Sequence, residues 1–225
     1  MTQTPGPGAV LFDVDGTLVD SNYLHVHAWV QAFAAVDHPV DAWRVHRRIG
    51  MGSGRLLREL LGDDTEALAD RVKQEHTARY ADLAGLLRPF DGARELVRDL
   101  ADRGARVVLA TSAAPEEVER LREVLDVDDL VQVTASQDVE EAKPEPELVE
   151  VALERAGVPA DRAVFVGDSV WDVQAAVRAG VPCVAVRSGG TSAAELTEAG
   201  AVAVHDDVAE VLRDLDASAL AAVLR

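Results

Sequence analysis

The 225-residue sequence predicts an α/β fold, a doubly wound parallel sheet with a helical segment inserted after its first strand. Two observations support this prediction. From residue 91 onward, short runs rich in β-branched residues alternate with helical stretches, which is typical of βαβ units and a parallel sheet covered on both faces. Before them, the apolar run Ala9–Phe12 precedes a long stretch without the pattern of a buried strand.

The N-terminal part of the chain begins with that apolar run, which ends at Asp13 and predicts a short buried strand. The following stretch is mainly helical and closes at Arg88-Pro89. Its expected helices cover residues 22–36, 41–49, 54–61 and 65–83. We therefore expect a discontinuous core domain, residues 1–20 and 91–225, and a helical domain over residues 21–90.

The C-terminal part of the chain alternates regularly. Gly104 ends the first helix of this part, and Pro115 stands at the first turn of the next one. The expected strands are 106–110, 130–134, 163–166, 182–186 and 201–204, and the expected helices are 93–102, 115–125, 146–156, 170–179, 193–199 and 207–215.

Charge and composition exclude several classes of partner. The chain has 40 acidic and 22 basic residues, for a formal net charge of −18. Such a chain repels a phosphate backbone and an anionic membrane surface, so we expect neither nucleic acid nor membrane as a partner. No apolar run reaches the ~18 residues that span a bilayer. The first residues lack the pattern of a signal peptide, and Cys183 is the only cysteine. We expect a cytoplasmic protein, either monomer or homodimer.

Polar side chains follow the predicted strands at their carboxyl ends, where parallel α/β sheets bind their ligands. They are carboxylates, hydroxyls and one of the two lysines in the chain: Asp13 and Asp15, Thr111 and Ser112, Lys143, and Asp168 and Asp172. Taken singly, each has an ordinary structural explanation, such as a turn, a helix cap or a solvated lysine. Their occurrence in order, one group after each strand, instead predicts a catalytic site.

The residue types indicate the chemistry. Carboxylates without a histidine or cysteine cluster suit a hard cation such as Mg²⁺. A metal ion, a lysine and hydroxyl donors together form a phosphate-binding set. A carboxylate beside them can act as a nucleophile, and a neighbouring carboxylate as acid and base.

Four segments of the chain resemble the motifs of the haloacid dehalogenase-like (HAD) hydrolase superfamily. They are residues 12–18 (FDVDGTL), 109–112 (LATS), 143–146 (KPEP), and 167–169 (GDS) with Asp172. The resemblance extends from Val10 to about Leu215, and it is to the group with a helical cap after the first strand. This group includes phosphoglycolate phosphatase, sugar phosphatases and β-phosphoglucomutase. The resemblance implies a Rossmann-like core and a cap domain.

The resemblance also implies roles for the motif residues. Asp13 would be the nucleophile that becomes an aspartyl phosphate, and Asp15 would protonate the leaving group and then activate water. Thr111, Ser112 and Lys143 would bind the transferring phosphoryl group. Mg²⁺ would be held by Asp13, by the backbone carbonyl of Asp15 and by Asp168. Asp172 would orient Lys143 or a metal-bound water.

The implied function is hydrolysis of a small phosphorylated metabolite. The substrate stays open among 2-phosphoglycolate, a sugar phosphate, a polyol phosphate and a nucleotide. One alternative is a β-phosphoglucomutase-type mutase, which the chain resembles at His25 and Trp29. The segment 111–114 lacks the second phosphate-binding lysine of the mutase, however, and the cap arginine is displaced. The other alternative is a non-catalytic binding module, against which the four intact motifs argue.

We expect the cap segment that follows the second expected helix to contact the substrate. Arg48 and Arg55 flank a glycine-rich loop, and an arginine fork suits a carboxylate or a second phosphate. The alternative is that both arginines only pair with nearby acids such as Glu59. His25 lies either near the site or elsewhere as a packed or surface residue.

Overall fold

The computed structural model describes residues 8–224. The first seven residues of the expected core segment, including most of the stretch that lacks a signal-peptide pattern, lie outside this range, as does Arg225. The strands are β1 (Ala9–Phe12), β2 (Arg106–Ala110), β3 (Val131–Thr134), β4 (Ala163–Gly167), β5 (Cys183–Val186) and β6 (Ala203–His205). The helices are α1 (Asn22–Ala35), α2 (Ala42–His46), α3 (Ser53–Leu61), α4 (Thr65–Leu83), α5 (Ala93–Asp102), α6 (Pro115–Leu125), α7 (Glu147–Ala156), α8 (Val170–Arg178), α9 (Ala193–Ala199) and α10 (Val208–Arg213).

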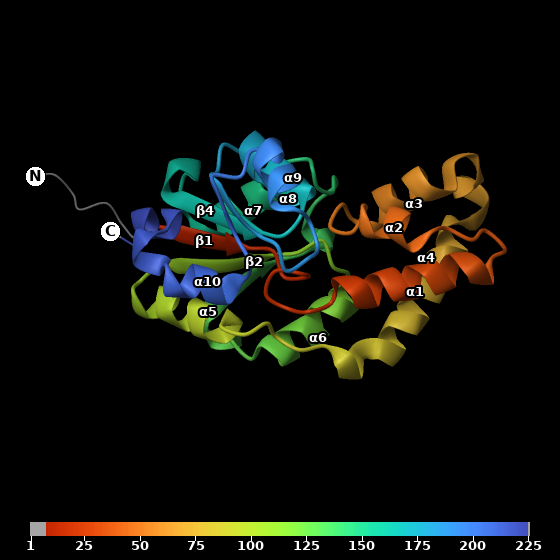
Figure 1. Cartoon of the computed structure of the whole chain (residues 1–225), viewed down its shortest axis with the longest axis horizontal. Coiled ribbons are helices and arrows are strands. Elements are labelled where there is room, and N and C mark those ends of the chain that lie inside the picture. Colours follow the sequence, from red (N-terminus) through yellow and green to blue (C-terminus); the bar gives the residue numbers. More distant parts are fainter. Residues whose placement is uncertain (1–7, 225) are drawn as a thin grey trace, which may run out of the picture.

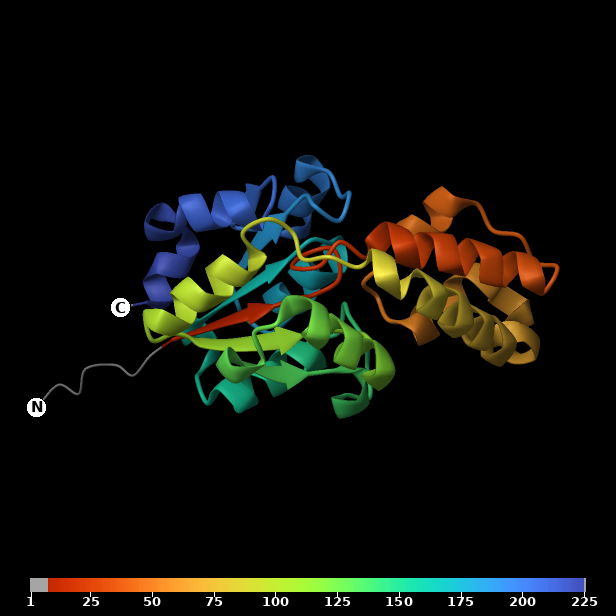
Figure 2. The same ribbon diagram turned by 90° about the horizontal axis from the view of Figure 1, so that it is seen from below.

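The six strands form one parallel sheet in the order β3-β2-β1-β4-β5-β6, so the predicted fold class is confirmed. β1 lies between β2 and β4, with Phe12 opposite Leu109 on one side and opposite Val166 on the other. This register brings the carboxyl ends of three strands together. Figure 2 shows the strands pointing toward the helical segment.

Alternating residues of each strand face two different helical layers. Val10 and Phe12 pack into a core with residues of α5, α6 and α10, whereas Ala9 and Leu11 pack into a second core with residues of α7, α8 and α9 (Figure 1). β1, β4 and β5 are buried along their whole length, and because both of their faces are covered they lack polar side chains at alternate positions. This explains the continuous apolar runs of the sequence.

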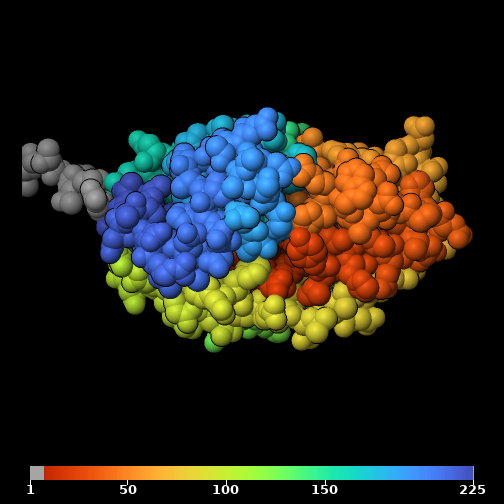
Figure 3. Space-filling model, viewed as in Figure 1, coloured from red at the N-terminus to blue at the C-terminus, as the bar shows by residue number. Residues whose placement is uncertain are grey.

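Helices α1 to α4 lie together beyond the carboxyl ends of the strands (Figures 1 and 2). They share an apolar cluster of their own, centred on side chains such as Trp29, Phe33, Leu57 and Val72. In Figure 3 this segment, coloured red to orange, packs directly against the light-blue part of the core.

α2 ends at His46, three residues before the predicted end. None of the described helices is both long and apolar enough to cross a bilayer.

The last strand begins two residues later than predicted. The amides of Gly200 and Ala201 still donate to the carbonyls of Thr197 and Leu196 in α9, at 3.0 and 3.1 Å. These bonds close the C-terminus of the helix, so the chain joins the sheet only at Ala203. The run that we expected to be a strand is thus partly a helix cap.

Candidate active site

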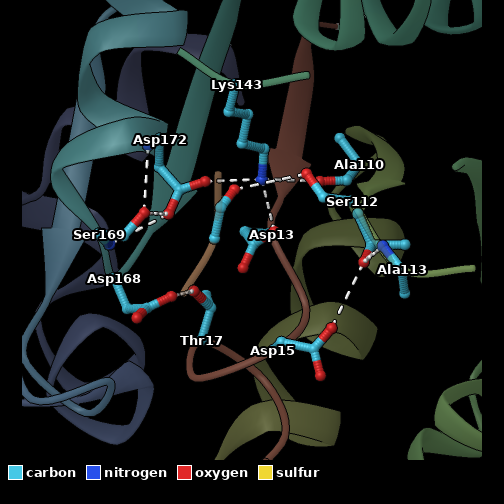
Figure 4. A network of polar contacts seen from close by, with 12 residues as sticks. Asp13, Asp15, Thr17, Ala110, Ser112, Ala113, Lys143, Asp168, Ser169 and Asp172 are labelled. Atoms are coloured by element: carbon cyan, nitrogen blue, oxygen red, sulfur yellow. Dashed lines mark hydrogen bonds and ion pairs between the residues drawn. The ribbon is translucent and has the colours of Figure 1, made fainter. Parts of the chain in front are cut away.

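Asp13 and Lys143 meet at the centre of the sheet's carboxyl edge. Asp13 directly follows β1, and its amide donates to Val166 of β4 at 2.9 Å. Lys143 lies in the loop between β3 and α7, and its side chain is fully buried. Its Nζ is 2.6 Å from Asp13 Oδ1 and 2.6 Å from Asp172 Oδ1 (Figure 4). The alternative of a solvated lysine is therefore wrong.

Asp172 is held in place by other contacts as well. It lies in the first turn of α8, where its Oδ2 accepts from the Ser169 amide at 3.0 Å and from the Ser169 hydroxyl at 2.6 Å. These contacts form a capping box. Both carboxylate oxygens of Asp172 are thus engaged, one by Lys143 and one by the helix cap.

Asp168 follows β4 and faces Asp13. Its Oδ1 accepts from the Thr17 hydroxyl at 3.1 Å. Asp13, Asp168 and Asp172 are buried, and each offers one oxygen, all three within 4.8 Å of one another. Lys143 contacts two of these three buried carboxylates, Asp13 and Asp172. Burial raises the pKa of Asp13 to about 8, although Lys143 opposes the rise. Burial also raises the pKa of Asp168. This excess of buried negative charge and the all-oxygen donor set fit Mg²⁺.

Asp15 turns away from that cluster. Its Oδ1 accepts from the Ser21 hydroxyl at 2.6 Å and lies 3.4 Å from His25 Nε2, and its Oδ2 lies 3.5 Å from the Thr111 hydroxyl. Burial opposes the charged forms of Asp15 and His25 and is the largest single influence on each pKa, but the hydrogen bond and the charge attraction between them, with smaller contributions from neighbouring groups, together outweigh it. The pKa of Asp15 therefore lies below its ordinary value and the pKa of His25 above its own. The two carboxylates of this motif therefore have pKa values shifted in opposite directions, upward for Asp13 and downward for Asp15.

The sequence left the place of His25 open, and the structure puts this residue against Asp15. Ser112 contacts the helical segment between β1 and α5, since its hydroxyl lies 3.5 Å from the carbonyl of Gly50. It lines both of the cavities that border the site. One, of about 130 Å³, includes Asp13, Asp15 and His25; the other, of about 460 Å³, includes the start of α3.

Arg48 and Arg55 of the helical segment both pair with Glu59. Arg48 Nε lies 3.2 Å from one Glu59 oxygen, and Arg55 Nε lies 3.3 Å from the other. The ion pairs that we gave as the alternative are therefore present. Arg48 also lines the cavity that contains Asp13, whereas Arg55 lines the larger neighbouring cavity.

Sequence reasoning missed several residues that line the smaller cavity. Among them are three residues of α4, one of α6 and one that follows β3: Lys73, His76, Thr77, Glu117 and Ser136. His76 Nε2 lies 3.2 Å from His25 Nδ1, and its ring stacks on Trp29 with centroids 3.8 Å apart. The spacing of the α4 residues, three and four apart, places them on one helix face and was the available signal. Nothing in the sequence shows which face of this helix meets the core.

Comparison with known proteins identifies the family of this chain. The family model of haloacid dehalogenase-like hydrolases matches residues 7–180. The phosphoglycolate phosphatase of Rhodospirillum rubrum is 36% identical over 217 residues, covering 91% of this chain and 89% of that protein.

Solved structures are similar over nearly the whole chain. The crystal structure of a hydrolase from Pseudomonas syringae is 34% identical, with a TM-score of 0.90, and covers 93% of this chain and 98% of its own. CbbY from Rhodobacter sphaeroides, a mutant in complex with xylulose-1,5-bisphosphate, is 27% identical with a TM-score of 0.76, covering 91% and 96%. The chain belongs to the haloacid dehalogenase-like hydrolase family and is a hydrolase.

Proposed function

We propose that this hydrolase is a Mg²⁺-dependent phosphatase that cleaves small phosphate monoesters through an aspartyl phosphate on Asp13. The observation that supports it best is the pairing of two unlike carboxylates in one cavity. Asp13 is held by a buried lysine, and Asp15 is held separately by Ser21 and His25. One can attack phosphorus while the other exchanges protons.

Lys143 orients the proposed nucleophile. It binds Oδ1 of Asp13, which leaves Oδ2 for the attack on phosphorus. Thr111, Ser112 and Lys143 would bind the phosphoryl oxygens, as sequence analysis proposes. Asp172, bound to Lys143 and capped by Ser169, keeps the lysine in position.

Asp13, Asp168 and the backbone carbonyl of Asp15 would hold Mg²⁺. When bound, the metal supplies the positive charge that lets an anionic phosphate approach a carboxylate. Asp15 would protonate the leaving oxygen and then take a proton from the attacking water. The Thr111 hydroxyl, near the Oδ2 of Asp15, contributes to its orientation.

Residues 21–90 would act as the cap domain that excludes water and contacts the rest of the substrate. The relatives named phosphoglycolate phosphatase support a small phosphorylated metabolite as substrate. The alternative is a β-phosphoglucomutase-type mutase. Against it, no lysine follows β2, where Ala113 and Ala114 line the cavity instead.

Phosphate release from a panel of phosphate monoesters, with Mg²⁺ and with EDTA, tests the proposal. Asp13→Asn keeps the shape of the side chain but cannot attack phosphorus, so turnover should fall below about a thousandth of wild type. Higher residual activity would refute the covalent mechanism. With β-glucose 1-phosphate we expect inorganic phosphate; glucose 6-phosphate formed instead would establish the mutase.

A further inference from the structure

Asn22 is the only asparagine in the sequence, and it is buried beside a proposed metal ligand. It is the first residue of α1, where the chain has left the core. Its Nδ2 donates to Asp168 Oδ2 at 2.8 Å and lies 3.4 Å from the carbonyl of Gly189. A residue of the helical segment therefore contacts the far side of the carboxylate cluster.

The orientation of this amide follows from its neighbours. A carboxylate and a carbonyl oxygen both accept hydrogen bonds, so the amide nitrogen must face them. The amide oxygen, Oδ1, is then buried without a donor in the described part of the chain. Buried polar atoms in native proteins nearly always have a partner, so this oxygen indicates a donor that is not part of the protein.

Two glycines from separate loops make room for Asn22 and Asp168. A Cβ at Gly16 would lie 2.2 Å from Asn22 Nδ2 and 2.7 Å from Asp168 Oδ2. A Cβ at Gly189 would lie 1.6 Å from Asp168 Oδ2 and 2.6 Å from Asn22 Nδ2. Any side chain at either position would displace the pair. The contact is therefore enclosed by the fold rather than made by a free surface side chain.

We propose that Asn22 is a positioning residue for the metal: its Nδ2 fixes the Asp168 carboxylate, and its Oδ1 accepts a hydrogen bond from a water on Mg²⁺. The inference rests on the proposed Mg²⁺ dependence. Mg²⁺ loses its waters reluctantly and keeps several of them in protein sites, which supplies the missing donor. Groups that hydrogen-bond metal ligands orient them and typically change metal affinity about 10–100-fold when removed.

The position of Asn22 links metal binding to the cap. The next residue, Tyr23, stacks on His46 of α2, and His46 Nε2 lies 2.9 Å from the same Gly189 carbonyl. The first residue of α1 and the last residue of α2 thus both contact the loop that contains Gly189. Tyr23 itself is exposed and touches no carboxylate of the cluster, which makes it a matched control.

Isothermal titration of metal-free protein with Mg²⁺ tests the inference. We expect wild type and Tyr23→Ala to bind one Mg²⁺ with equal affinity, and Asn22→Ala to bind it about 10–100-fold more weakly. Because the Asn22 side chain caps no helix, alanine should preserve α1; Asn22→Ser replaces this variant if circular dichroism shows a loss of fold.

The outcomes separate this inference from the proposed function. Wild-type Mg²⁺ affinity in Asn22→Ala overturns the role of Asn22 and leaves the phosphatase proposal intact. An equal loss of affinity in Tyr23→Ala also overturns it, because the effect would then come from the start of α1 as a whole. If the wild-type protein itself binds no Mg²⁺, the proposed metal dependence fails first, and the role of Asn22 fails with it.

Discussion

Removal of the buried lysine should destabilise the protein in a pH-dependent way. Lys143→Met removes the charge and keeps an unbranched, flexible side chain that is only one heavy atom shorter, so little cavity forms. Asp13 and Asp172, each 2.6 Å from the lysine, then lose their cation while they stay buried. Breaking a buried ion pair at one partner costs about 3–5 kcal/mol, and we expect a loss of this size near pH 8.5.

The loss should shrink as the pH falls. The pKa of Asp13 rises from a reference value of 3.8 to about 8 in the folded protein, mainly through burial. Once the lysine is gone, burial and the charges of Asp172 and Asp15 raise this pKa unopposed. A carboxyl group whose pKa is raised by folding stabilises the folded state below its unfolded pKa, and this contribution is lost as the pH rises through the folded pKa. Near pH 6, protonation of Asp13 should therefore offset part of the missing cation.

Urea denaturation without Mg²⁺, at about pH 6 and about pH 8.5, measures both effects. Lys73→Met is the matched control, because Lys73 is the only other lysine and its side chain is exposed. Equal stability of the two variants at the higher pH, or an identical loss for Lys143→Met at both values, would refute the account of a buried charge. Mg²⁺ should restore part of the stability of Lys143→Met.

Three further predictions follow from the same contacts. Burial, and to a smaller extent His25, lower the pKa of His76 to about 2, so this residue should cost about 2 kcal/mol of stability as the pH falls from 6.5 to 5. In His76→Phe, the unfolding free energy measured by denaturation should fall less steeply over this pH range, and an unchanged pH dependence would contradict the prediction. EDTA should abolish phosphate release and Mg²⁺ should restore it, with Ca²⁺ a poor substitute because it prefers longer bonds and more ligands; full activity in EDTA would argue against a metal. If Arg48 binds the substrate, Arg48→Ala should lower kcat/KM for the preferred substrate by about ten- to a hundredfold and barely change hydrolysis of p-nitrophenyl phosphate. An unchanged kcat/KM for both substrates would mean that Arg48 only pairs with Glu59.

The strands and most helices could be predicted because their causes are local. Buried parallel strands are apolar on both faces, as Ala9–Phe12 shows, and proline or glycine begins or ends helices such as α5 and α6. The last strand was misplaced because the amides after α9 satisfy helix carbonyls, a choice that depends on the cap geometry at Gly200. The hydrophobic pattern of the sequence alone does not show where the cap of α9 ends and where the strand begins.

The sequence by itself determined which chemical groups follow each strand, and therefore the identity of the carboxylates and the lysine at the sheet's edge. This follows from parallel topology, in which all carboxyl ends meet at one edge. Only the tertiary structure decided that Lys143 is fully buried between Asp13 and Asp172, that Asn22 holds Asp168, and that His76 reaches His25. These contacts join segments up to 146 residues apart, and the packing of the helical segment on the core decides which helix faces meet them.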